Sequence, residues 1–134
     1  MVMQSLQGLP AFLAYFCLAV ALVIAFLLIY TRLTPINEYE LIRKNVPGAA
    51  IALGLSLLGF ALPLASAIAH TADLVDCAIW GVIALIVQLI TFFAVRIPVP
   101  DLSGRIAAGE LAPAIWLGLA SLTAGLLSAA SMTL

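Results

Sequence analysis

Residues 46–69 read VPGAAIALGLSLLGFALPLASAIA and contain no charged side chain. A helix rises about 1.5 Å per residue, so this stretch is long enough to span a hydrocarbon core of roughly 30 Å. Three further blocks are similarly long and apolar: residues 11–30, 77–95 and 111–134. The sequence therefore predicts an all-α integral membrane protein, a bundle of four transmembrane helices in a single membrane domain over residues 1–134.

The composition of the chain agrees with a membrane location. Of its 134 residues, 66% are hydrophobic and 8% are charged, and the mean hydropathy is +1.28. A soluble domain of this size needs more polar surface. Membrane strands are not expected, because the roughly ten-residue alternation of a barrel is missing. The first block is longer than the apolar core of a secretory signal, and residues 1–12 carry no Lys or Arg, so we expect it to remain as a helix.

The cations set the expected orientation. All five lie in the connection between the first and second helices or in that between the third and fourth: Arg32, Arg43, Lys44, Arg96 and Arg105. With four helices these two connections share a side, and the positive-inside rule assigns that side to the cytoplasm. Both termini are then expected on the outer side. The remaining connection, with His70, Asp73 and Asp76 and no Lys or Arg, agrees with an outer location.

One hexapeptide occurs almost twice, as AIALGL at residues 50–55 and AIWLGL at residues 114–119. The same shift of 64 residues pairs two arginines and superposes the first apolar block on the third. This pattern predicts two internal repeats, about residues 11–70 and 75–134, each with two helices and one charged connection. An even number of helices per repeat makes the two copies parallel. Two unrelated hairpins of similar composition are the alternative.

Small residues on the second and fourth helices are expected to bring those helices together, because membrane helices associate through close packing rather than through a hydrophobic force. Gly54 and Gly118 hold equivalent places in the hexapeptide and are predicted to hold equivalent places in the contact. Gly59 and Gly125 are further candidates for close packing. A second subunit can use the same faces, so we also expect a homo-oligomer.

Both charged connections are predicted to contain short interfacial helices. In the first, Thr34 and Pro35 resemble an N-cap and a first helical residue. The polar positions that follow are Asn37, Glu38, Glu40, Arg43 and Lys44. In the second connection, Asp101 is a possible cap between Arg96 and Arg105. We expect these polar residues to contact membrane lipids or a cytoplasmic protein partner, and a charged face that is merely solvated is the alternative.

Two residues interrupt the apolar character of the helices. Gln88 lies in the third helix, and an amide in hydrocarbon costs free energy unless it is hydrogen-bonded. Pro63 lacks a backbone N–H and is expected to kink the second helix. Gln88 can tie helices together or line a solute path, and Pro63 can be a structural kink or a hinge.

Several short motifs occur together in this chain. They are Asn37-Glu38 followed by Leu41-Ile42 and Asn45, the segment 59–63, Trp80-Gly81 with Gln88, and Ala129-Ala130 with Met132. In this combination they resemble the YjfL-like family of small bacterial inner-membrane proteins, a duplicated domain of unknown function. The resemblance covers nearly the whole chain and implies a four-helix protein in the bacterial inner membrane, where the expected orientation makes both termini periplasmic. It implies no established reaction.

The sequence favours no enzyme. It has one histidine and no catalytic triad, metalloprotease motif or Gly-rich phosphate loop. No cofactor and no metal are expected, and the net charge of -1 gives no basic face for nucleic acid. The leading hypothesis is a structural or partner-binding membrane module that self-associates and presents its cytoplasmic segments. The alternative is an oligomeric channel or carrier for a small solute, with a path past Gln88 and Pro63.

Overall fold

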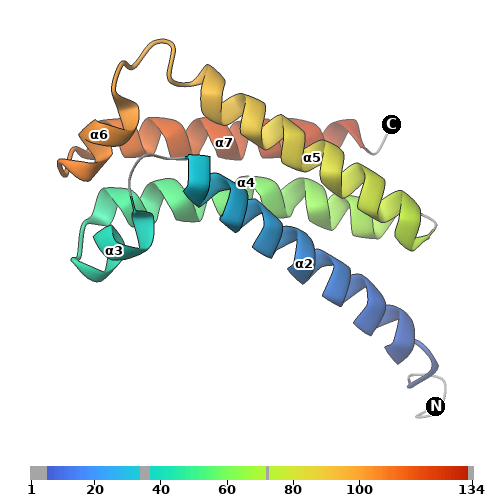
Figure 1. Ribbon diagram of the computed structural model, residues 1–134. Helices are drawn as coiled ribbons and strands as arrows, with labels where there is room; N and C mark the ends of the chain where they lie inside the picture. The colour runs from blue at the N-terminus through green and yellow to red at the C-terminus, as the bar shows by residue number, and fades with distance from the viewer. Residues whose placement is uncertain (1–5, 34–36, 72, 133–134) are drawn as a thin grey trace.

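The computed structural model describes residues 6–33, 37–71 and 73–132, and all regular structure in these ranges is helical (Figure 1). The helices are α2 (Leu9–Leu33), α3 (Glu38–Arg43), α4 (Pro47–His70), α5 (Leu74–Ala94), α6 (Leu102–Ala107) and α7 (Leu111–Ser131). By length and composition, α2, α4, α5 and α7 can each cross a membrane. The predicted all-α fold with four long apolar helices is therefore confirmed.

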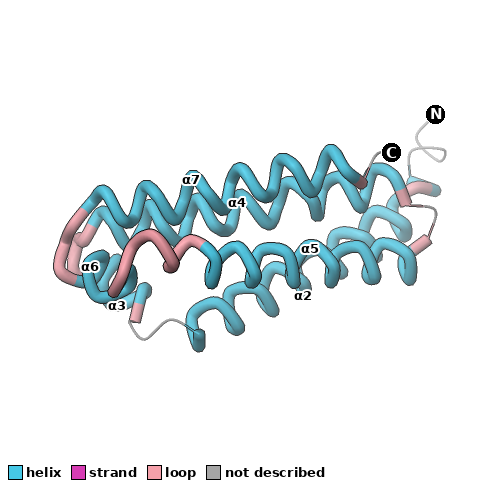
Figure 2. The backbone as a smooth tube through the Cα atoms, turned by 90° about the horizontal axis from the view of Figure 1, so that it is seen from above, coloured by secondary structure: helices cyan, strands magenta, loops and turns pink. Residues whose placement is uncertain are grey.

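Helices α4 and α7 form the centre of the bundle. They run side by side in the same direction and make its most extensive contact (Figure 1 and Figure 2). Helix α5 packs against both, and α2 contacts α4 and α5. The short helices α3 and α6 lie at one end, whereas the first and last described residues lie at the other (Figure 1). All five cations therefore lie at the end that holds α3 and α6.

The contact between α4 and α7 brings backbone against backbone. A Cβ atom added to Gly59 would collide with the carbonyl of Ser121, and one added to Gly125 would collide with the carbonyl of Gly59. Further along, a Cβ added to Gly118 would come within 2.6 Å of Leu55 Cδ1. Close approach of this kind supplies the van der Waals contacts that hold helices together in lipid. Gly59, Gly118 and Gly125 thus lie where the two helices touch.

Gly54 is placed differently. It is exposed, and nothing lies within 4 Å of the position that a Cβ would take there. The prediction that Gly54 and Gly118 hold equivalent places in the helix contact is therefore wrong. Gly118 meets Leu55 instead, and because adjacent residues of a helix point about 100° apart, this contact turns Gly54 away from α7.

Aromatic side chains attach α2 to the bundle near the α3 end. The Phe26 ring stacks on Phe60 of α4 with 5.0 Å between centroids, and Tyr30 meets Phe92 of α5 edge-on at 5.1 Å. Phe26 and Tyr30 are the buried residues of α2, whereas Phe12, about four turns before Phe26, is exposed. Helix α2 is therefore held by its C-terminal half.

We expect Gly59→Ala to destabilise the protein by about 1–3 kcal/mol, because the new methyl group collides with backbone that has little room to move. Gly54→Ala is the matched control, the same change in the same helix but into open space. It should be neutral or slightly stabilising, since alanine favours helix. The measurement is the thermal unfolding midpoint of each purified variant as a monomer in one detergent, so that a contact of Gly54 with a second copy does not contribute. Equal midpoints for the two variants would contradict the packing role of Gly59.

Candidate functional site

Gln88 lies where three helices meet. Its side chain is 3% exposed, and its Nε2 donates to the carbonyls of Gly59 at 3.1 Å and Ser121 at 3.2 Å. In an α-helix the N–H of residue 63 would donate to the carbonyl of residue 59, but Pro63 has no N–H. Helix α4 nevertheless runs unbroken through Pro63. The amide of Gln88 therefore replaces the hydrogen bond that Pro63 removes.

Other polar side chains also join α4 to α7. Ser56 Oγ donates to Ser121 Oγ at 3.3 Å, and both side chains are buried. Nearer the opposite end, Ser66 Oγ donates to the carbonyl of Ala129 at 3.0 Å. Polar groups in hydrocarbon need partners within the protein. These serines supply one another and the facing backbone with such partners, so they act as ties between the two helices.

Helix α3 begins later than predicted. Asn37 is its N-cap, and Asn37 Oδ1 accepts a hydrogen bond from the Glu40 N–H at 3.2 Å. The predicted cap Thr34 and first residue Pro35 lie outside the described residues. Glu40 and Lys44 form an exposed ion pair at 3.1 Å. We call the exposed polar residues of this segment the α3 surface: Asn37, Glu40, Arg43 and Lys44.

Glu38 does not belong to the α3 surface. The sequence pattern places Glu38 among the residues that contact lipid or a partner, but its side chain is only 3% exposed, so this prediction is wrong. Glu38 and Arg96 both lie close enough to Tyr30 of α2 to act on it electrostatically. A carboxylate in the first turn of a helix is also favoured by the helix dipole. Glu38 therefore anchors α3 to the bundle.

The two arginines of the second connection differ in exposure. The guanidinium of Arg96 lies 4.2 Å from the centroid of the Phe92 ring, a cation–π contact, and its Nη2 donates to the buried Ser103 Oγ at 3.0 Å. Arg105 instead pairs with Glu110 at the surface, at 3.1 Å. The hydrogen bond and charge of Glu110 raise the pKa of Arg105. Arg96 thus joins α5 to α6, and Arg105 remains a surface cation.

An aspartate precedes both α5 and α6, but the predicted capping by Asp101 of α6 is not found. Asp101 precedes α6 in the left-handed region, with φ of 54°, and its side chain makes no capping hydrogen bond. Asp73 does cap α5, since its Oδ1 accepts the Asp76 N–H at 2.7 Å.

The histidine of the same connection bonds within its own helix, since His70 Nδ1 lies 2.9 Å from the carbonyl of Ser66. In the described ranges, no group of three or more His, Cys, Asp or Glu residues could hold a metal ion.

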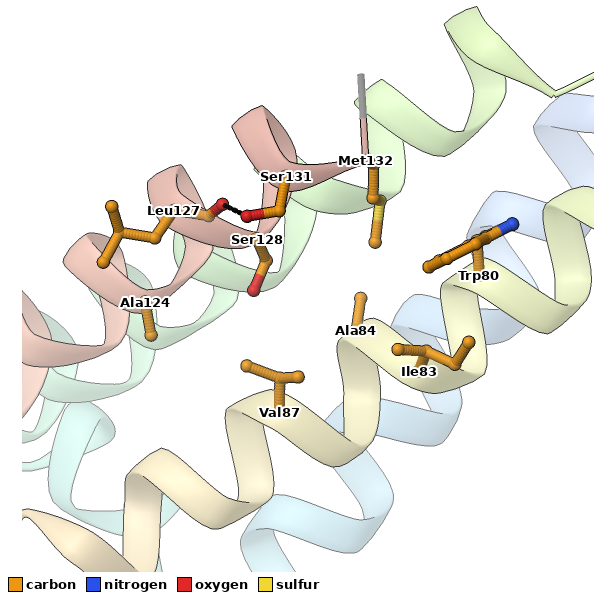
Figure 3. Close-up of a pocket in the computed structure, with 9 residues that line it drawn as sticks. All are labelled: Trp80, Ile83, Ala84, Val87, Ala124, Leu127, Ser128, Ser131 and Met132. Atoms are coloured by element: carbon orange, nitrogen blue, oxygen red, sulfur yellow. Dashed lines mark hydrogen bonds between the residues drawn. The ribbon is translucent and has the colours of Figure 1, made fainter. Parts of the chain in front are cut away.

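A groove between α5 and α7 was not predicted from the sequence (Figure 3). It has a volume of about 410 Å³ and mostly apolar walls. The lining residues are Trp80, Ile83, Ala84, Val87, Ala124, Leu127, Ser128, Ser131 and Met132. A polar pocket of about 80 Å³, lined in part by His70 and Asp76, shares Trp80 and Met132 with the groove. The walls come from two separate helices, so no local motif marks this site.

Four long apolar helices with polar ties between them define a polytopic helical membrane protein. The chain belongs to the family described as Domain of Unknown Function (DUF350), whose family model matches residues 4–132. It is 43% identical over 131 residues to the UPF0719 inner membrane protein YjfL of Escherichia coli strain K12, covering 98% of this chain and 99% of that protein. The protein of the same name from Escherichia coli O157:H7 is equally similar. No solved structure matches the chain. The predicted membership of a YjfL-like family is confirmed.

We expect Gln88→Leu to lower the free energy of unfolding by about 1–3 kcal/mol, because it leaves the Gly59 carbonyl buried without its donor. In a Pro63→Ala background the restored N–H can bond that carbonyl, so the cost of Gln88→Leu should fall by about 1 kcal/mol. The measurement is a double-mutant cycle of unfolding midpoints in one detergent. Ser66→Ala is the control, since its bond to α7 does not involve Gly59. A cost of Gln88→Leu that is the same in both backgrounds would refute the link.

Proposed function

We propose that this protein is a structural or partner-binding module of the inner membrane that presents its α3 surface to a cytoplasmic protein. The observation that carries the proposal is the attachment of α3, whose polar residues are exposed while Glu38 is buried beneath them. A helix of six residues is not stable by itself in water. Its fixed attachment therefore supports a role in presenting this surface. The cations there and Arg105 are also suited to anionic lipid headgroups.

The proposed location and orientation have two supports. The relatives from Escherichia coli are named inner membrane proteins. All five cations lie at the end that holds α3 and α6, which favours a cytoplasmic location for that end and periplasmic termini. Tyr39 and Ile42 are exposed beside the charged residues of α3. This mixture of apolar and charged surface supports an interfacial position for α3.

The proposed fold is a duplication of residues 11–70 and 75–134. The order of elements is long, short, long in α2 to α4 and again in α5 to α7. The serine ties between α4 and α7 join residues 65 and 63 positions apart, close to the sequence shift of 64. Two parallel copies related by an axis along the membrane normal would produce such pairs. Under this shift Gln88 corresponds to Ile24, so the proposed copies differ at the residue that bonds to Gly59 and Ser121.

Self-association is the remaining part of the proposed architecture. The outer faces of the long helices are apolar, and α4 exposes Ala50 and Gly54 on one of them. Small residues at the surface of a membrane helix allow another helix to approach closely. Gly54, which does not contact α7, is therefore available for a contact with a second copy of the chain.

The channel or carrier alternative has less support. Pro63 and Gln88 are both buried, and the Gln88 amide nitrogen already donates to two carbonyls. A solute passing these residues would have to break hydrogen bonds that hold α4, α5 and α7 together. The bonds support a structural role for both residues.

The proposed topology predicts a labelling pattern. In a background with Cys17→Ser and Cys77→Ser, we expect Lys44→Cys and Arg105→Cys to react with a membrane-impermeant maleimide only after the inner membrane is opened. Gln7→Cys, near the other end, should react in intact spheroplasts. Positive-inside bias is the physical reason. Labelling of Lys44→Cys and Arg105→Cys from opposite sides, or of Gln7→Cys from inside, would overturn the proposed topology.

The proposed docking surface predicts an effect of charge reversal. Glu40→Lys should reduce co-purification of the cytoplasmic partner with the full-length chain by about tenfold, because a like charge placed opposite a partner's cation is costly. The double variant Glu40→Lys, Lys44→Glu keeps the ion pair and net charge but should still lose the partner. Glu110→Lys is the control on the α6 side. The proposal fails if quantitative co-purification recovers the same proteins with all three variants.

A further inference from the structure

The groove between α5 and α7 is apolar along most of its length and polar at one end. It extends along α5 from Val87 to Trp80, about 10 Å at the helical rise. At Trp80 and Met132 it meets the polar pocket. Its volume of about 410 Å³ falls within the range of small-molecule sites. An apolar chain attached to a small polar group matches this shape.

Ser128 places an unused hydroxyl in the groove. Figure 3 shows its side chain directed into the space between α7 and α5, toward the side of Val87. Thr123 and Ser131 of the same helix each donate to a carbonyl of the preceding turn, both at 2.8 Å. Ser128 makes no such bond in the part of the chain that the structure describes. A hydroxyl in an apolar groove gains from a ligand acceptor such as an ester carbonyl.

The polar pocket carries negative charge without a cation. Asp76 lines it and, among the described residues, forms no ion pair. The five Lys and Arg residues all lie at the far end of the bundle. His70 also lines the pocket, and since its Nδ1 donates to the Ser66 carbonyl, its Nε2 is free to bond a second group. The pocket therefore suits a small headgroup that brings its own positive charge.

We propose that this groove and pocket bind one phospholipid whose headgroup carries a primary ammonium, of the phosphatidylethanolamine type. The ammonium donates to Asp76, an ester carbonyl accepts from Ser128, and one acyl chain lies along the groove toward Val87. A pocket of about 80 Å³ accommodates an ammonium more readily than the bulkier trimethylammonium of phosphatidylcholine.

A second copy of the chain is a poorer occupant of this site. Neighbouring copies in one membrane share an orientation, so each would place its cations at the α3 and α6 end and none beside Asp76. The partner's apolar face would also leave the Ser128 hydroxyl without an acceptor. A zwitterionic lipid supplies both the positive charge and the ester oxygens, and a bilayer that surrounds the helices can deliver it laterally to the groove.

The experiment uses Trp80, which borders both the groove and the pocket and is 40% exposed. The full chain with Trp116→Phe has Trp80 as its one tryptophan and is reconstituted in phosphatidylcholine vesicles. Brominated phosphatidylethanolamine or brominated phosphatidylcholine with the same chains is then added as quencher. We expect phosphatidylethanolamine to reach half-maximal quenching at about two- to fivefold lower mole fraction, the range that an interfacial ion pair supports. Both lipids carry no net charge, so general electrostatic attraction does not produce the difference.

Two pairs of variants test the contacts, with helicity checked by circular dichroism. Asp76→Asn should abolish the preference, whereas Glu40→Gln, the same change of acid to amide at the other end, should keep it. Ser128→Leu fills the groove and should reduce quenching by phosphatidylethanolamine, whereas Thr123→Leu, which lies outside this groove, should not. Equal quenching by the two lipids, a preference that survives Asp76→Asn, or a Trp80 that neither lipid reaches because a second copy covers it would each overturn the proposal.

Discussion

The bundle depends on one contact, the approach of α4 and α7 through their backbones at Gly59 and Gly125. Lipid supplies no hydrophobic force between helices, so this approach has to supply the attraction. It also brings a difficulty, because Pro63 frees the Gly59 carbonyl at the point of closest contact, where water cannot enter. The Gln88 side chain of α5 removes that difficulty. Helix α5 is therefore fixed in position and rotation by a hydrogen-bonding need of α4.

This requirement explains why α2 and α5 are held so differently. In the proposed duplication they are counterparts, yet only α5 carries a glutamine, and Ile24 takes the equivalent place in α2 with half of its surface exposed. Without a polar group to satisfy, α2 is attached by the aromatic contacts of Phe26 and Tyr30 near one end. The glutamine at position 88 thus contributes to the firmer attachment of α5, which α2 lacks.

The sequence predicts where the helices lie along the chain better than it predicts which face of each helix is buried. Uncharged blocks longer than a bilayer can only be helices in lipid, and the four long helices follow from that. A partner for the carbonyl freed by Pro63 could also have been predicted from the sequence, since a proline in a helix leaves the carbonyl four residues earlier without its N–H donor. Gln88 is that partner. Gly54 was misplaced because the identity of two hexapeptides says nothing about which side of each helix faces the other. Glu38 was misplaced because α3 is too short to show a periodic face, and its burial depends on how α3 packs against the rest of the bundle, α4 above all.

The segregation of charge has consequences at both ends of the bundle. Positive residues gathered at the α3 and α6 end favour the proposed orientation, and there Arg96 is held by the Phe92 ring and by Ser103 of its own protein. The same sorting leaves Asp76 at the other end with no cation in the described chain. A neighbouring copy turned the other way would contradict the proposed orientation, because its cations would lie on the periplasmic side. In the proposed lipid site the counter-charge for Asp76 comes from outside the protein, and a lipid ammonium is a source that the membrane itself provides.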